Sequence, residues 1–192
     1  LVHTVMFTSV QGGCGTSAAA AAYALQQAKQ GRKICYLNLQ KFGCSDLYFT
    51  GEGTMSFSDM IYALKSRKSN LLLKLEGTMK QDASGVNFFS DCRNAFDMIE
   101  LKDSEVASLL QALGQVGEIE EIVVDLSGDL TERQLLLMEE YADSIVYVCD
   151  GSITGIRKFE KYCETARVLE ERKEVVLLNK TTLLYNRYSS KS

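Results

Sequence analysis

Residues 10–25 read VQGGCGTSAAAAAYAL, a glycine-rich segment that leads directly into an alanine-rich one. Its glycines let the backbone turn sharply and leave no Cβ in the path of a ligand. Residues 17–30 are rich in Ala, Leu and Gln and predict a helix that ends at Gly31. The free N–H groups and the positive dipole end at the start of a helix attract anions. The segment therefore predicts a phosphate-binding loop, and a tight strand-to-helix turn without a ligand is the alternative.

Short apolar runs rich in β-forming residues alternate with longer helical patterns along the chain. The predicted strands are residues 2–8, 33–39, 85–89, 121–126, 144–149 and 182–188. The predicted helices are residues 17–30, 57–67, 69–79, 103–116, 131–141 and 154–178. This alternation predicts an α/β fold with a doubly wound, mostly parallel sheet and helices on both faces.

The overall composition is that of one globular domain, residues 1–192. A net charge of −4 and a pI near 5.2 give no specific nucleic-acid signal. No apolar run has the length of a transmembrane segment, and the sequence shows no signal peptide. The chain starts at Leu1, without an initiator Met, in sequence typical of a strand. We therefore expect it to be a piece of a longer protein.

The cysteines and the histidine exclude two classes of site. Six cysteines are scattered without a CxxC pair or metal-ligand spacing, and His3 is the only histidine. A Cys/His zinc site and a Ser-His-Asp triad therefore lack the residues they need. We expect reduced, mostly buried thiols in a cytoplasmic protein.

Two phosphate-binding motifs compete for the glycine-rich loop. Residues 13–18 fit the dinucleotide fingerprint G-x-G-x-x-A, but that motif needs an acid after the second strand, and residues 36–40 (YLNLQ) contain none. Residues 11–17 fit the P-loop variant K-G-G-x-G-K-[ST] in outline, with Gln11 and Thr16 at its lysine positions. In an ordinary P-loop the final Ser or Thr hydroxyl binds Mg²⁺.

With this loop the sequence resembles the ParA/MinD-type (SIMIBI) P-loop ATPases, whose variant loop is known as the deviant Walker A motif and is degenerate here. Asn38 and Gln40 stand where that family has Asp-x-Asp after the second strand. Residues 121–128 (EIVVDLSG) resemble the Walker B strand and switch II, with Asp125 as the acid. Residues 185–187 (YNR) resemble a strand end whose Asn commonly faces adenine. The resemblance runs in order from residue 5 to residue 187.

One branch of the family, the TadZ/CpaE-like proteins, resembles the chain most closely. The matching features are GG-x-G-T-S, the Phe-Gly pair after the second strand, and residues 56–64 (SFSDMIYAL). Proteins of that branch assemble and place Tad-type pili at a cell pole, and many carry an N-terminal receiver-like domain. The resemblance thus implies pilus or secretion assembly proteins as partners, and a cytoplasmic location at the periphery of the inner membrane, at a cell pole.

The resemblance also implies a set of site residues, with ATP and Mg²⁺ as cofactors. The implied nucleotide-binding residues are Gln11, Gly12, Gly13, Cys14, Gly15, Thr16, Ser17, Ala18, Asn186 and Arg187. Ser17 and Asp125 are the implied metal residues, and Asn38, Gln40 and Asp46 are the candidates for catalysis. Asp150 ends a predicted strand at the edge where α/β proteins bind ligands, and is a further candidate for the lining of the site.

The replaced residues decide what activity to expect. In the family one lysine neutralises phosphate charge and the other reaches across a dimer, whereas Thr16 and Gln11 carry no charge. Loss of a trans-acting cation removes about 10³–10⁵ in phosphoryl-transfer rate. The amides of Asn38 and Gln40 are poor proton acceptors. We therefore expect an ATP-binding homodimer with weak or absent ATPase; the alternatives are an active MinD-like ATPase switch, a nucleotide-free interaction scaffold and, more remotely, a dinucleotide enzyme.

Overall fold

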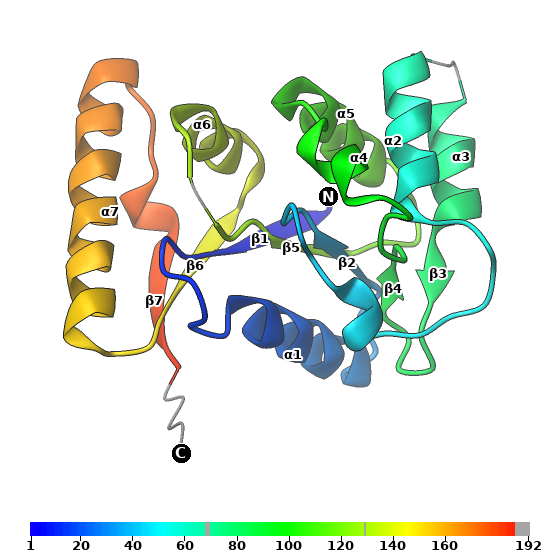
Figure 1. Cartoon of the computed structure of the whole chain (residues 1–192), viewed down its shortest axis with the longest axis horizontal. Helices are drawn as coiled ribbons and strands as arrows, with labels where there is room; N and C mark the ends of the chain where they lie inside the picture. Colours follow the sequence, from blue (N-terminus) through cyan, green and yellow to red (C-terminus); the bar gives the residue numbers. More distant parts are fainter. Residues whose placement is uncertain (68–69, 129, 187–192) are drawn as a thin grey trace.

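A single sheet crosses the protein in the computed structural model, which describes residues 1–67, 70–128 and 130–186 (Figure 1). Among these residues seven strands pair in the order β3-β4-β2-β5-β1-β6-β7. Every pairing is parallel except that of β3 with β4. The predicted α/β fold with a mostly parallel sheet is therefore confirmed.

The strands and helices alternate much as the sequence predicts. The strands are β1 His3–Thr8, β2 Ile34–Asn38, β3 Lys80–Gln81, β4 Asn87–Phe88, β5 Glu121–Asp125, β6 Ser144–Cys149 and β7 Thr181–Tyr185. The α-helices are α1 Thr16–Lys29, α2 Phe57–Ser66, α3 Leu71–Thr78, α4 Ala95–Ile99, α5 Asp103–Leu113, α6 Glu132–Tyr141 and α7 Ile153–Lys173. Two short 3₁₀ helices, η1 Ser45–Leu47 and η2 Leu178–Lys180, complete the described elements.

The two faces of the sheet carry different layers. Figure 1 shows α1 on one face, with α2 to α7 packed on the other. The buried alanines of α1, among them Ala20 and Ala24, lack bulk and let this helix lie close to the strands. Because the strands are parallel, the carboxyl ends of β1, β2, β5, β6 and β7 lie at one edge of the sheet. This edge gathers the predicted site residues.

Several element boundaries differ from the prediction. The predicted helix 154–178 ends at Lys173, because Glu174 adopts a left-handed conformation (φ 54°) and the chain turns to bury Leu177. β3, η1 and α4 were not predicted, since each is too short to show a period in sequence. The predicted strand 182–188 ends at Tyr185 within the described residues, and residues 187–188 lie outside them.

Two expectations about the chain as a whole can be compared with the structure. All six cysteines are free thiols; Cys14, Cys35 and Cys149 are buried, and Cys44 is exposed. None of the helices within the described ranges combines the length and apolar character that crossing a bilayer requires.

Candidate functional site

The glycine-rich loop joins the carboxyl end of β1 to the first turn of α1. Gly13 (φ 71°) and Gly15 (φ 85°) occupy the left-handed region, where a side chain is strained. Gly15 is the N-cap residue of α1, and no side chain caps this helix. The sequence places glycine at both positions where the turn needs a positive φ.

Most backbone N–H groups of this loop have no hydrogen-bond acceptor among the described residues. Gln11 N donates to Ser9 Oγ (3.0 Å) and Ala19 N donates to Gly15 O (2.9 Å). Between them, none of the N–H groups of residues 12–18 donates a hydrogen bond to another described residue. Unpaired N–H groups at a helix N-terminus form an anion site, because they converge at the positive end of the helix dipole.

The side chains of the loop face the protein interior. Cys14 is buried, and its Sγ lies within hydrogen-bond distance of Ser9 Oγ (3.2 Å), the Gln11 carbonyl (3.3 Å) and Thr16 Oγ1 (3.2 Å). Thr16, at a lysine position of the motif, is therefore buried against a thiol and is only 6% exposed. Its hydroxyl is directed toward Cys14 and adds no charge at the mouth of the loop.

Gln11, at the other lysine position, is held by the loop between β6 and α7. Its Nε2 donates to Asp150 Oδ2 (2.8 Å), while its Oε1 is buried without a hydrogen-bond partner among the described residues. A Cβ on Gly155 would lie 2.6 Å from Gln11 Oε1 and 2.6 Å from Asp150 Oδ1, so any other residue at position 155 would displace these two side chains. The structure thus places Asp150 beside the loop.

Ser17 stands at the centre of a network of oxygen atoms. Its Oγ lies 2.8 Å from Gln40 Oε1 and also contacts Asp125 Oδ2, so one hydroxyl proton faces two acceptors. Ser127 Oγ donates to Asp125 Oδ1 (2.8 Å) and accepts from Gln40 Nε2. Burial raises the pKa of the Asp125 carboxyl, although the hydrogen bonds from Ser17 and Ser127 act in the opposite direction.

This network fits a hard divalent cation. Mg²⁺ prefers oxygen ligands, and it binds proteins through one or two side chains together with phosphate and water. Around Ser17 there are more acceptor oxygens than protons to bond them, and a cation could bind the oxygens that lack a proton. No group of three or more His, Cys, Asp or Glu within the described ranges is placed to hold a metal ion, and Ser17 and Asp125 are the side chains available to a cation beside the loop.

The three candidates for catalysis have different surroundings. Gln40 contacts Ser17 directly, as described above. Asn38 is fixed at the end of β2, because its Oδ1 accepts from Gln40 N (2.9 Å) and its Nδ2 donates to Tyr36 OH (3.3 Å). Asp46 pairs with Asp91 instead: Asp46 N donates to Asp91 Oδ2 (3.2 Å), and Asp91 N donates to Asp46 Oδ2 (3.1 Å). Asp46 forms no hydrogen bond with the glycine-rich loop among the described residues.

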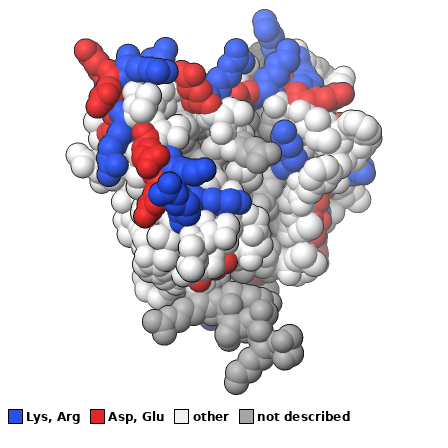
Figure 2. All heavy atoms as spheres, turned by 60° about the vertical axis from the view of Figure 1, so that its left-hand side comes forward, with Lys and Arg blue, Asp and Glu red and all other residues white. Residues whose placement is uncertain are grey.

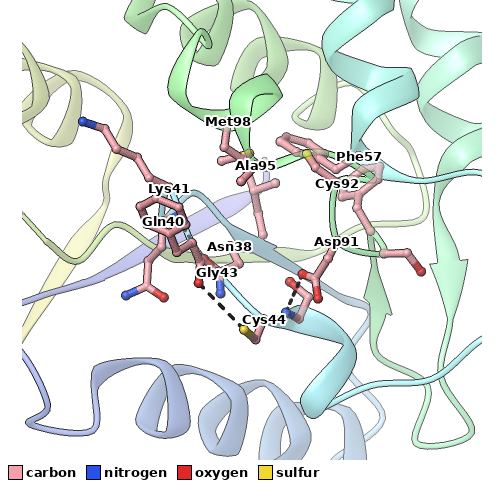
Figure 3. A pocket seen from close by; sticks show the side chains of 15 residues that line it. Asn38, Gln40, Lys41, Gly43, Cys44, Phe57, Asp91, Cys92, Ala95 and Met98 are labelled. Atoms are coloured by element: carbon pink, nitrogen blue, oxygen red, sulfur yellow. Dashed lines mark hydrogen bonds between the residues drawn. The ribbon is translucent and has the colours of Figure 1, made fainter.

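A cavity of about 310 Å³ adjoins the end of β2. Figure 3 shows Asn38, Gln40 and Lys41 on one side of it and Asp91 with Cys92 on the other. Burial is the main cause of the raised pKa of the Asp91 carboxyl. Sequence reasoning predicted the strand at residues 85–89 but missed the far wall that follows it, because no sequence pattern shows that this strand, β4, pairs with β2. The parallel pairing of β4 with β2 brings the two walls together.

The end of β7 contacts the loop from another direction. Asn186 Nδ2 donates to the Cys14 carbonyl (3.0 Å), and Asn186 N donates to the Cys149 carbonyl (2.8 Å). The amide nitrogen is therefore occupied by the loop backbone, whereas the sequence suggested a residue facing the base. Arg187, also predicted to bind nucleotide, lies outside the described residues.

The lysines and arginines of the described residues do not pair with the glycine-rich loop. No described Lys or Arg forms a hydrogen bond or ion pair with residues 9–18. Figure 2 shows Lys, Arg, Asp and Glu side chains mixed along the face that carries α7, without a broad basic patch in that view. The backbone N–H groups are thus the groups of the loop itself that can bind an anion, while Lys41 lines the adjoining cavity and Lys158 and Lys161 line a pocket together with Val10.

Comparison with known proteins supports the fold through structure only. No protein-family model matches the sequence, and no curated protein sequence matches it. A ParA family ATPase from Chlorobium tepidum TLS has a similar structure, with a TM-score of 0.76, 18% identity, and coverage of 97% of this chain and 75% of that one. The septum site-determining protein MinD from Pyrococcus horikoshii OT3, complexed with Mg-ADP, gives a TM-score of 0.70 at 15% identity, covering 98% and 72%.

A third similar structure is a plasmid partition protein from Borrelia burgdorferi B31 bound to AMPPNP. It gives a TM-score of 0.63 at 13% identity and covers 100% of this chain and 78% of that one. At these identities the likeness concerns the fold. The chain has the α/β P-loop fold of the ParA and MinD ATPases.

Proposed function

We propose that this protein binds ATP with Mg²⁺ at the glycine-rich loop and hydrolyses it weakly or not at all. The observation that carries the proposal is the set of unpaired N–H groups of residues 12–18 at the start of α1. These groups fit phosphate oxygens without any side-chain charge. Two similar structures contain Mg-ADP and AMPPNP, which supports a nucleotide as the anion.

The metal would be held by Ser17, with Asp125 behind it and Gln40 beside it. When bound, Mg²⁺ would neutralise phosphate charge and orient the anion. The chain's own residues position it: Ser127 and Ser17 fix the two oxygens of Asp125, and Gln40 fixes Ser17. In this assignment the final serine of the P-loop motif, Ser17, retains its role in binding the metal.

Hydrolysis needs groups that this site lacks. Thr16 and Gln11 are directed away from the loop mouth and are uncharged, so neither can stabilise charge that develops on the transferred phosphoryl group. Asn38 and Gln40 carry amides, which orient water but accept a proton poorly. The proposed site therefore retains ATP without rapid turnover.

For the cellular role we propose a nucleotide-stabilised homodimer that localises or assembles other proteins, with Tad-type pilus assembly as the specific process. The support is the sequence resemblance to the TadZ/CpaE branch, and the fold shared with a MinD that occurs in a MinC:MinD complex from Aquifex aeolicus. The proposed location is the cytoplasmic periphery of the inner membrane, at a cell pole. The partners would be other pilus or secretion assembly proteins.

Single-turnover hydrolysis and sedimentation with Mg-ATP test the two halves of this proposal. We expect radiolabelled Mg-ATP in the presence of excess protein to be hydrolysed no faster than in the protein-free control. We also expect the sedimentation coefficient to rise from monomer to dimer on addition of Mg-ATP. Hydrolysis well above background contradicts the first half, and a monomer at saturating Mg-ATP contradicts the second.

Replacement of Ser17 by alanine is expected to remove the contribution of Mg²⁺ to nucleotide affinity. The loss is expected to be about tenfold, the lower end of the range for a lost group in a metal site. Titration with ATP in the presence of Mg²⁺ and in EDTA measures it: the variant should bind ATP equally in both. Ser127→Ala is the matched control, since it removes a hydroxyl from the same carboxylate and keeps Ser17. An unchanged Mg²⁺ effect in Ser17→Ala would contradict the assignment.

A further inference from the structure

Two hydrogen bonds connect the glycine-rich loop to distant parts of the chain. One joins Gln11 to Asp150, and the other joins the Cys14 carbonyl to Asn186. We propose that Asp150 and Asn186 are positioning residues that hold the phosphate loop in its anion-binding conformation before any ligand binds. The inference rests on the proposed function, since it takes this loop as the phosphate site. It assigns Gln11, the counterpart of a ligand-binding lysine, to the support of the loop.

Asn186 anchors the loop through the Cys14 carbonyl. The two residues are far apart in sequence, and the Nδ2–O distance is 3.0 Å. The Asn186 backbone is itself fixed, because its N–H donates to the Cys149 carbonyl at the end of β6. The described peptide bonds are all trans, and a trans peptide directs its C=O and N–H in opposite directions. With the Cys14 carbonyl held by Asn186, the Gly15 N–H points away from Asn186 and stays free for an anion.

Asp150 anchors the other flank of the loop through Gln11. Its Oδ2 accepts from Gln11 Nε2, and its Oδ1 accepts from Ser152 N (2.9 Å). Ser152 Oγ in turn accepts from Gly155 N (3.0 Å) and caps α7. Gln11 is therefore tied to the start of a 21-residue helix, a rigid support.

The two anchors, at Gln11 and Cys14, lie on either side of Gly12 and Gly13 in the chain. In a phosphate loop with lysines, attraction between the lysines and the bound phosphate can order the loop. This loop has Gln11 and Thr16 at those positions, so that attraction is missing. A loop already ordered loses less conformational entropy on binding, so fixed anchors raise affinity without adding a contact to the ligand. The inward direction of Gln11 thus compensates in part for its missing charge.

The test measures loop order without ligand and phosphate affinity with inorganic tripolyphosphate. The variants are Asn186→Ala, the isosteric Asn186→Asp that lacks the donor, Asp150→Ala, Gln11→Ala and the double variant Gln11→Ala/Asp150→Ala. Asn87→Ala is the matched control, because Asn87 Nδ2 in β4 donates to the Ile34 carbonyl (3.1 Å), a bond of the same type away from the loop. The steady-state ¹⁵N heteronuclear NOE of the loop glycines reports order on the fast timescale.

We expect a lower NOE at Gly12 and Gly13 in each single anchor variant and unchanged values in Asn87→Ala. Tripolyphosphate affinity should fall about three- to tenfold, the effect of one lost hydrogen bond. Asp150→Ala should add nothing in the Gln11→Ala background, because the two residues act through one bond. Unchanged NOE values in the anchor variants, or additive effects of Gln11 and Asp150, would overturn the inference.

The outcomes for the anchors and for the proposed function are separable. The NOE is recorded without ligand, so it tests the anchors even if no anion binds. A wild-type loop that is ordered, loses order in the variants and binds neither tripolyphosphate nor Mg-ATP supports the anchors and refutes the proposed function. Tight tripolyphosphate binding that is the same in wild type and anchor variants refutes the role of the anchors and supports the proposed function.

Discussion

Gly15→Ala is expected to weaken Mg-ATP binding about ten- to four-hundredfold. Alanine at the φ of 85° costs about 1–2 kcal/mol. Its Cβ would also lie 2.2 Å from Asn186 Nδ2, so the Asn186 side chain must move and release the Cys14 carbonyl. The lost hydrogen bond adds about 0.5–1.5 kcal/mol. The backbone strain and the lost hydrogen bond both favour a different loop conformation in the free variant. ATP binding must restore the original conformation, and the free energy this costs lowers the affinity. Isothermal titration with Mg-ATP measures the loss.

The neighbouring glycines give matched controls for this prediction. Gly13 also has a positive φ (71°), but a Cβ added there would have no atom within 4 Å, so Gly13→Ala introduces strain without a clash. Gly12 has neither a positive φ nor a close neighbour. We expect the smallest loss for Gly12→Ala, an intermediate loss for Gly13→Ala and the largest for Gly15→Ala. Equal affinities in all three variants would contradict a backbone cradle of this shape.

Thr16→Lys is expected to strengthen Mg-ATP binding about tenfold without restoring hydrolysis. A hydrogen bond from a charged donor contributes about 1.5–3 kcal/mol, and displacement of the buried threonine from Cys14 offsets part of it. The gain should shrink at high salt, since it is electrostatic. Hydrolysis stays at background because Asn38 and Gln40 still carry amides and Gln11 still faces Asp150. Titrations at low and high salt, with single-turnover assays, check both parts.

The control for added charge is Gln30→Lys, at the opposite end of α1. It places the same charge on the same helix, far from the loop, at a C-cap where a cation is tolerated. We expect no gain in Mg-ATP affinity there. If Thr16→Lys bound Mg-ATP no better than Gln30→Lys, the missing charge would not be what limits affinity. If Thr16→Lys hydrolysed ATP rapidly, the amides at positions 38 and 40 would not be the barrier.

The longer strands of the sheet and the turn of the glycine-rich loop could be predicted from the sequence, because both depend on patterns among neighbouring residues. Strand and helix periods repeat over enough residues to be recognised, and glycine at positions 13 and 15 marks the left-handed turns. The family resemblance implied Ser17, Asp125 and Gln40 as site residues, and the parallel strands, which end at one edge, bring the three together. These features depend on nearby residues or on the order of the strands.

The directions of individual side chains could not be derived from the sequence. The motif marks Thr16 and Gln11 as replacements for lysine, but no local pattern shows that both face inward, toward Cys14 and Asp150. The contact of Asn186 with Cys14 depends on packing between the two ends of the chain. The wall of the cavity beside Asp91 depends on the pairing of β4 with β2, and the predicted strand 85–89 does not by itself show which strand it pairs with.

Calorimetric titration of the wild-type protein with Mg-ATP, followed by analysis of the recovered nucleotide, tests the central claim most directly. The claim is that a backbone cradle binds ATP after the charged side chains of the motif have been replaced. It predicts saturable binding of one nucleotide per chain and recovery of the nucleotide as ATP. Absence of saturable heat, or recovery of the nucleotide as ADP at a rate well above the protein-free control, would contradict it.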